Sequence, residues 1–138
     1  MTQIPIHEGL FTWPADRPQL IGSRCRGCGE VTFPQQGSCP ACTRHESESV
    51  LLSRRGQLWT WTVQRFPPPS PPFSGDPETF EPFGVGYVEL PEGLRVEARL
   101  TESDADKLAI GIEMELVIEP FGVDADGNER LTFAFQPV

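Results

Sequence analysis

Apolar and polar residues alternate along much of the second half of this chain. In residues 94–100, LRVEARL, apolar residues take every second position and arginine or glutamate stands between them. The same alternation occurs in 113–121 and 130–135. A period of two is typical of strands that bury one face. The residues that this pattern predicts to face inward are Leu94, Val96, Ala98, Leu100, Met114, Leu116, Ile118, Leu131, Phe133 and Phe135.

Two further segments, 57–66 and 83–90, are rich in aromatic and β-branched residues and are also predicted to be strands. Between the third and fourth strands, SDADKLAI at 103–110 predicts a short helix with Ser103 as its N-cap. DADG at 124–127 predicts a hairpin turn. Five strands with one short helix in this order favour a small barrel of the OB type.

The four cysteines of the chain all lie in one stretch of the first half, CRGCGEVTFPQQGSCPAC. They form two Cys-x-x-Cys pairs, Cys25 with Cys28 and Cys39 with Cys42. Each pair can bring two sulfur atoms to one metal ion, and two pairs complete a tetrahedral zinc shell. Gly29 follows the first pair, where the turn favours a positive φ. The spacing predicts a zinc ribbon in which the metal folds a segment too small to fold alone.

The same cysteines could serve two other uses. A four-cysteine iron site of the rubredoxin kind has the same spacing, so zinc and iron both stay open. A redox Cys-x-x-Cys would not require a second copy. A closed shell of four thiolates leaves no open coordination position, so the predicted role is structural.

Composition limits the classes of function. The net charge is −9, and residues 70–138 carry fifteen acidic residues against four basic ones. Such a chain is a poor general binder of nucleic acid, because phosphate contacts supply most of that affinity. No apolar run reaches 18 residues and no secretory signal is apparent, so we expect no membrane association. Four cysteines without an export signal favour the reducing cytoplasm.

The segment 66–83 joins the first two predicted strands and holds seven prolines and four phenylalanines. Loops of this length are usually functional or disordered. Two interpretations stay open, a lid packed on its own barrel and a surface for a partner. For the second, the candidate anchors are Phe66, Phe73, Phe80 and Phe83.

Catalytic machinery is hard to find in the sequence. His7 and His45 are isolated and are expected to be solvated, and the metal would occupy all four cysteines. Trp59 and Trp61 are predicted to share one strand face with Val63, either as barrel core or as a stacking platform for a base. Four arginines that surround the ribbon and its link to the barrel could pair with phosphate groups: Arg24, Arg26, Arg54 and Arg55.

The chain resembles the zinc-ribbon and OB-fold family associated with acyl-CoA enzymes. The resemblance lies in the cysteine pairs with Gly29, Phe33 and Pro34, in residues 86–93, and in residues 110–114. It implies an accessory subunit, in a hetero-oligomer with a thiolase-fold enzyme that acts on acyl-CoA thioesters, possible CoA binding, and a place in lipid or steroid metabolism. The four arginines are then candidates for the CoA phosphates.

These observations predict a mostly β protein in which a rubredoxin-like zinc ribbon precedes a five-stranded OB barrel. The expected boundaries are an N-terminal segment at 1–19, the ribbon at 20–52 and the OB-fold domain at 53–138. We expect no catalytic residues, structural zinc held by the four cysteines, and a thiolase-fold partner. A single-stranded nucleic-acid-binding protein and a free-standing acyl-CoA-processing enzyme are the alternatives.

Overall fold

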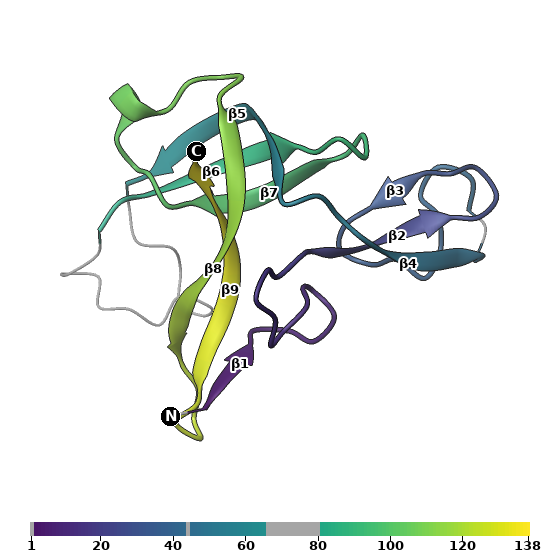
Figure 1. The fold of residues 1–138 in the computed structure, drawn as a ribbon, viewed down its shortest axis with the longest axis horizontal. Coiled ribbons are helices and arrows are strands. Elements are labelled where there is room, and N and C mark those ends of the chain that lie inside the picture. The colour runs from purple at the N-terminus through teal and green to yellow at the C-terminus, as the bar shows by residue number, and fades with distance from the viewer. Residues whose placement is uncertain (1, 44, 66–80) are drawn as a thin grey trace.

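A computed structural model describes residues 2–43, 45–65 and 81–138, and its regular secondary structure consists almost entirely of strands (Figure 1). A three-stranded sheet has the order β3-β2-β4. Its strands are β2 (Ile21–Cys25), β3 (Val31–Thr32) and β4 (Ser47–Leu51). A second, six-stranded sheet contains β1 (Gln3–Pro5), β5 (Arg55–Gln64), β6 (Phe83–Glu89), β7 (Arg95–Leu100), β8 (Glu113–Val123) and β9 (Glu129–Pro137).

The larger sheet closes into a barrel. Its order is β1-β9-β7-β6-β5-β8, and an additional pairing of β8 with β9 joins the two ends. Strands β5 to β9 therefore form the predicted five-stranded barrel, which is confirmed. Strand β1 adds to β9 in parallel, with Ile4 opposite Arg130. The contact between β7 and β9 is short, because only Arg99 and Leu100 of β7 have partners in β9.

The barrel interior is filled by the residues that the alternation predicts. Among these, Val96, Ala98, Leu100, Met114, Leu116, Leu131 and Phe135 are buried. Leu94, Ile118 and Phe133 are partly buried and pack against the same cluster. Position 86 in this region favours glycine, because a Cβ there would lie 2.7 Å from the Thr60 carbonyl oxygen. The strands and their inward faces thus follow from a period of two.

The prediction that Trp59 shares one strand face with Trp61 was wrong. The pairing of β5 with β6 shifts register between Leu58 and Thr60, which places Trp59 at a β-bulge. Leu58 is buried, whereas Trp59 is 45% exposed. Trp61 does pack against the core. The extra residue of the bulge reverses the alternation, so Trp59 lies on the outer surface instead of beside Trp61.

The predicted helix is much shorter than its sequence suggested. Only a single 3-10 turn, η2 (Ala105–Lys107), forms between β7 and β8. Its N-cap is Asp104, whose side chain accepts a hydrogen bond from the Asp106 N–H, so the assignment of Ser103 was wrong. The hairpin turn is confirmed, since Gly127 donates its N–H to the Asp124 carbonyl at 3.1 Å. Within the described residues, no helix has the length and apolar character needed to cross a membrane.

The small sheet lies beside the barrel (Figure 1), and side chains of both parts belong to one hydrophobic cluster. Leu20 and Leu52 are fully buried between them and join the main core. Phe33, in the loop after β3, packs edge-on against Phe133 of β9, with 5.4 Å between ring centroids. Arg54 donates hydrogen bonds to the carbonyls of Pro18 and Leu116. The segment before β2 is thereby tied to the barrel.

Two predictions stay open. Of the candidate anchors in 66–83, Phe66, Phe73 and Phe80 lie outside the described residues. Phe83 is the first residue of β6, and the Arg99 guanidinium lies 4.5 Å from its ring centroid. The boundaries proposed for the three segments of the chain also stay a prediction.

Candidate metal centre

The two cysteine pairs stand on two turns of similar geometry at one end of the small sheet. In the first turn, the Gly29 N–H donates to the Cys25 carbonyl at 2.9 Å, and Gly29 has φ +80° as predicted. In the second, the Thr43 N–H donates to the Cys39 carbonyl at 2.8 Å. Thr43 has φ +64°, a conformation that β-branched residues rarely adopt. Both turns direct two sulfur atoms toward the same point.

The four sulfur atoms form a compact set. The Sγ atoms of Cys25 and Cys42 are 3.5 Å apart, as are those of Cys28 and Cys39. All four lie within 4.8 Å of one another. Tetrahedral zinc with bonds of about 2.3 Å separates its sulfur ligands by about 3.8 Å. The cysteines are therefore positioned to bind a zinc ion.

The thiols of this set influence one another's protonation. The backbone N–H of Cys28 donates to the Cys25 sulfur and is the main reason why the pKa of Cys25 falls to about 6. At Cys28, the Glu30 N–H lowers the pKa, but the neighbouring cysteine thiols, first of all Cys39, together with partial desolvation outweigh it and raise the pKa to about 12. Four thiols this close do not all ionise unless a positive charge balances them.

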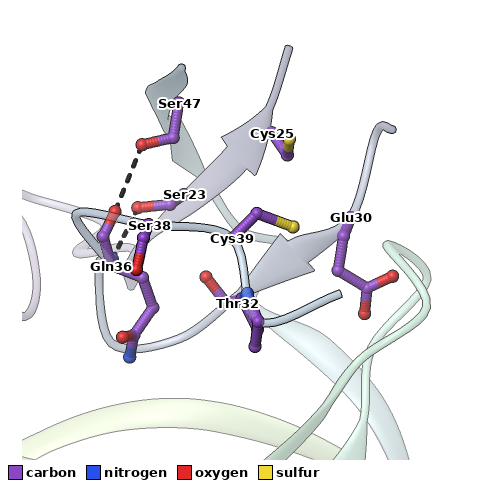
Figure 2. Close-up of a pocket in the computed structure, with 9 residues that line it drawn as sticks. Ser23, Cys25, Glu30, Thr32, Gln36, Ser38, Cys39 and Ser47 are labelled. Atoms are coloured by element: carbon purple, nitrogen blue, oxygen red, sulfur yellow. Dashed lines mark hydrogen bonds between the residues drawn. The ribbon is translucent and has the colours of Figure 1, made fainter. Parts of the chain in front are cut away.

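The second cysteine turn is held against the sheet by the Gln36 backbone (Figure 2). The Gln36 N–H donates to Ser23 Oγ at 2.9 Å, and Ser47 Oγ donates to the Gln36 carbonyl at 3.1 Å. Ser23 is 5% exposed and is the one buried polar residue among those described. These bonds position the loop that leads to Cys39, and no pattern in the sequence predicts them.

Such a site has a structural rather than a catalytic chemistry. Four thiolates would fill the coordination shell of zinc and leave no position for water or substrate. Cys25 and Cys39, one from each pair, are buried, whereas Cys28 is exposed. A metal held here would join β2, the loop after it and the turn before β4.

The four candidate arginines fall into two groups. Arg24 and Arg26 are exposed on the ribbon at β2, and Arg26 lies 3.9 Å from Glu48. Arg54 is occupied by the carbonyls of Pro18 and Leu116. Arg55 pairs with Glu113 at 2.8 Å and with Glu115 at 3.0 Å. The structure therefore brings Arg54 and Arg55 together and leaves the other two on the ribbon.

Arg54 and Arg55 line an open hollow at the junction of ribbon and barrel. It has a volume of about 570 Å³, and Arg17 contributes a third guanidinium. Gln19, Ser53 and Pro91 complete the lining. The sequence did not single out Arg17, because it lies in an irregular N-terminal stretch with no pattern to relate it to Arg54. The side chains of Arg55 and Glu115 stabilise each other's charged forms, which raises the arginine pKa and lowers that of the glutamate.

A four-cysteine ribbon joined to a five-stranded OB barrel defines a distinct class of two-part protein. Residues 12–48 match the family described as the ChsH2 rubredoxin-like zinc ribbon domain. Residues 49–119 match the C-terminal OB-fold domain of ChsH2. The chain belongs to this ChsH2 family of zinc-ribbon and OB-fold proteins, which confirms the resemblance seen in the sequence.

Several known proteins are similar over most of the chain. The benzoylsuccinyl-CoA thiolase subunit BbsA of Thauera aromatica is 34% identical over 134 residues, covering 96% of this chain and 87% of BbsA. A DUF35 domain-containing scaffold protein of Methanocaldococcus jannaschii is 32% identical over 125 residues, covering 89% of this chain and 84% of the scaffold protein. A chain in a solved structure described as the Ltp2-ChsH2(DUF35) aldolase aligns with TM-score 0.61 and 28% identity. The alignment covers 86% of this chain and 84% of that chain.

Proposed function

We propose that this chain is a non-catalytic accessory subunit of a thiolase-fold enzyme that acts on acyl-CoA thioesters. The observation that carries the proposal is similarity over nearly the full length to a protein named as a thiolase subunit, and to a chain in a structure described as an aldolase. The name of the scaffold relative supports a role in assembly. The proposal includes a hetero-oligomer, a cytoplasmic location and a reaction in lipid or steroid metabolism.

The chemistry of the described residues supports a role without catalysis. The four thiols form one metal-binding set, so none is left as a nucleophile. His7 and His45 are both exposed, on the N-terminal segment and after the second cysteine turn respectively. General acid–base catalysis needs a base held within hydrogen-bond reach of the substrate, usually in a site that shifts its pKa. The partner subunit is proposed to supply such groups.

Contact with the CoA portion of the substrate is a second part of the proposal. The hollow at the ribbon–barrel junction gathers three arginines, Arg17, Arg54 and Arg55, in a chain of net charge −9. Arg24 and Arg26 add two exposed guanidinium groups on the ribbon. Arginine pairs well with phosphate through two parallel hydrogen bonds. A CoA thioester carries several phosphate groups, so this side of the protein is the proposed place for them.

The main test is purification of a tagged chain from its native host. We expect a thiolase-fold subunit in fixed stoichiometry, identified by mass spectrometry. The reconstituted complex should cleave or condense acyl-CoA esters, whereas the isolated chain should be inactive. Turnover by the isolated chain at the rate of the complex would contradict the proposal.

The CoA contact is tested separately by kinetics of the reconstituted complex. Arg17→Gln with Arg55→Gln removes two charges of the hollow, and Arg24→Gln with Arg26→Gln removes the two on the ribbon. Arg54 is left in place because it holds two backbone carbonyls. We expect the Michaelis constant for the acyl-CoA to rise about threefold in at least one double variant, since partly exposed charges are screened by salt. Unchanged constants in both would exclude these arginines.

A further inference from the structure

One edge of the barrel is open along β7. The partner strand β9 pairs with β7 only at Arg99 and Leu100, although β7 begins at Arg95. On its other side, β7 pairs with β6 along its whole length. Among the described residues, positions 95–98 therefore have a paired strand on one side only.

The hydrogen-bond pattern shows which backbone groups face the open side. The Leu90 N–H donates to the Leu94 carbonyl, which makes this a hydrogen-bonded pair of the β6–β7 hairpin. In an antiparallel ladder, hydrogen-bonded pairs alternate with pairs that do not bond each other. Arg95 and Glu97 belong to pairs of the second kind, so their N–H and C=O groups point away from β6. Thr101, two residues beyond Arg99, donates its N–H to the Phe135 carbonyl of β9, which agrees with this alternation. No described residue accepts from or donates to the backbone of Arg95 or Glu97 on that side.

The open edge borders a groove of about 730 Å³ between the barrel and the ribbon. Its walls come from β6, β7, β8 and β9, from the N-terminal segment, and from the loop after β3. Seven of the twelve lining residues are apolar, with Phe33 and Pro34 on the ribbon side and Phe121 and Phe133 on the barrel side. An extended chain placed along β7 would therefore have aromatic surfaces beside it.

The charged groups of the groove are already paired. Arg95 lies 3.1 Å from Glu89 and stacks on exposed Trp59 at 3.9 Å. Arg99 lies 3.6 Å from Glu119. The Tyr87 hydroxyl donates to Glu97 at 3.2 Å. The groove therefore offers backbone hydrogen bonds and apolar contact rather than a strong charge, which suits a segment with few charged side chains.

We propose that an extended segment of the catalytic partner subunit adds as a strand to the open edge of β7, at Arg95 and Glu97. This inference rests on the proposed function for the identity of the partner. Strand addition takes its affinity from main-chain hydrogen bonds and its specificity from pockets for alternate side chains. Four residues of strand span about 13 Å, which is enough for the backbone groups of both Arg95 and Glu97 to bond the incoming chain. Exposed Tyr87 on β6 and Trp59 on β5 lie on the outer face of the same sheet, one and two strands from this edge, and belong to the residue types that dominate interface energetics.

Hydrogen–deuterium exchange of the zinc-loaded chain tests the inference directly. In the free chain, the amides of Arg95 and Glu97 should exchange fast, whereas those of Val96 and Ala98, which face β6, should exchange slowly. In the complex with the co-purified thiolase-fold subunit, the first two amides should slow by at least tenfold. Slow exchange in the free chain would overturn the proposal, because its own residues or a second copy would then cover the edge.

A proline substitution tests whether the backbone donor matters. Glu97→Pro removes an N–H that has no partner among the described residues, and prolines are tolerated at strand edges. Glu97→Gln is the matched control, because it removes the same charge and keeps the N–H. We expect Glu97→Pro to weaken the complex about tenfold and Glu97→Gln by less than about twofold, at similar melting temperatures. Equal affinities of both would overturn the proposal.

The outcomes separate this inference from the proposed function. If the wild-type chain binds no thiolase-fold subunit, the proposed function fails. If it binds one while the Arg95 and Glu97 amides stay unprotected, only the strand addition fails. Protection of these amides by saturating CoA alone would assign the groove to a small ligand and also overturn the proposal. The exchange measurement on the wild-type chain decides the matter even if Glu97→Pro does not fold.

Discussion

Removal of the metal should unfold the ribbon and leave the barrel folded. Among the described residues of 21–51, the buried hydrophobic side chains are Cys25, Val31 and Cys39. Complete burial of one valine contributes about 1.5–3 kcal/mol. Binding of structural zinc in small ribbons contributes about 10–16 kcal/mol. The metal therefore outweighs the ribbon's own apolar burial several-fold, whereas the barrel buries most of the main cluster without it.

Exchange with and without a chelator measures this difference. In the zinc-loaded protein, the amides of β2, such as Gly22 and Arg24, should be protected along with those of β8. After chelation, β2 should lose its protection, while Leu116 in β8 keeps most of its own. Metal analysis of the starting material should give one zinc per chain, which also separates zinc from iron.

Two variants provide the controls for the metal prediction. Cys39→Ser should reproduce the chelated state without any chelator, because it removes a buried ligand. Ser38→Ala, next to it and exposed, should bind metal as the wild type does. The reasoning is refuted if chelated protein keeps slow exchange throughout β2, since the ribbon would then be stable without metal.

Three further predictions concern single contacts. Thr43→Gly should stabilise the zinc-loaded protein by about 1 kcal/mol in urea denaturation, because it relieves a positive φ; a loss of stability would contradict this. Phe33→Ala and Phe133→Ala should show a coupling of about 1 kcal/mol in a double-mutant cycle, whereas additive effects would mean that the ring contact contributes nothing. The Asn128 backbone N–H lowers the pKa of Asp124, so this carboxylate stabilises the fold above its unfolded pKa and loses that effect as pH falls; Asp124→Asn should flatten the stability profile between about pH 5 and pH 2, and an unchanged profile would refute this.

Much of the fold could be predicted because its information is local. The alternation in 94–100 and 113–118 identifies strands and their buried faces without knowledge of any neighbour, since side chains of a strand point to opposite sides in turn. The two Cys-x-x-Cys pairs likewise identify a metal-binding set, because four thiolates at this spacing suit one tetrahedral ion. Gly29 could be assigned a positive φ for the same local reason.

Other features could not be read from the sequence because they depend on distant residues. The bulge that turns Trp59 outward exists only in the register between β5 and β6. The helix expected at 103–110 has good local signals but forms a single 3-10 turn between β7 and β8. Local propensity is a weak preference that tertiary contacts override.

The sequence alone determined the parts of the protein. These are the strands with a defined buried face, one tetrahedral thiolate set, and the order of ribbon before barrel. Only the tertiary structure decided how these parts meet. It placed β1 beside β9, gathered Arg17 with Arg54 and Arg55, and left Arg95 and Glu97 at an open edge. The physical reason is that side-chain periodicity is a property of a few consecutive residues. Register and closure instead depend on packing between segments far apart in the chain, as for Gln3 and Glu129, which are 126 positions apart.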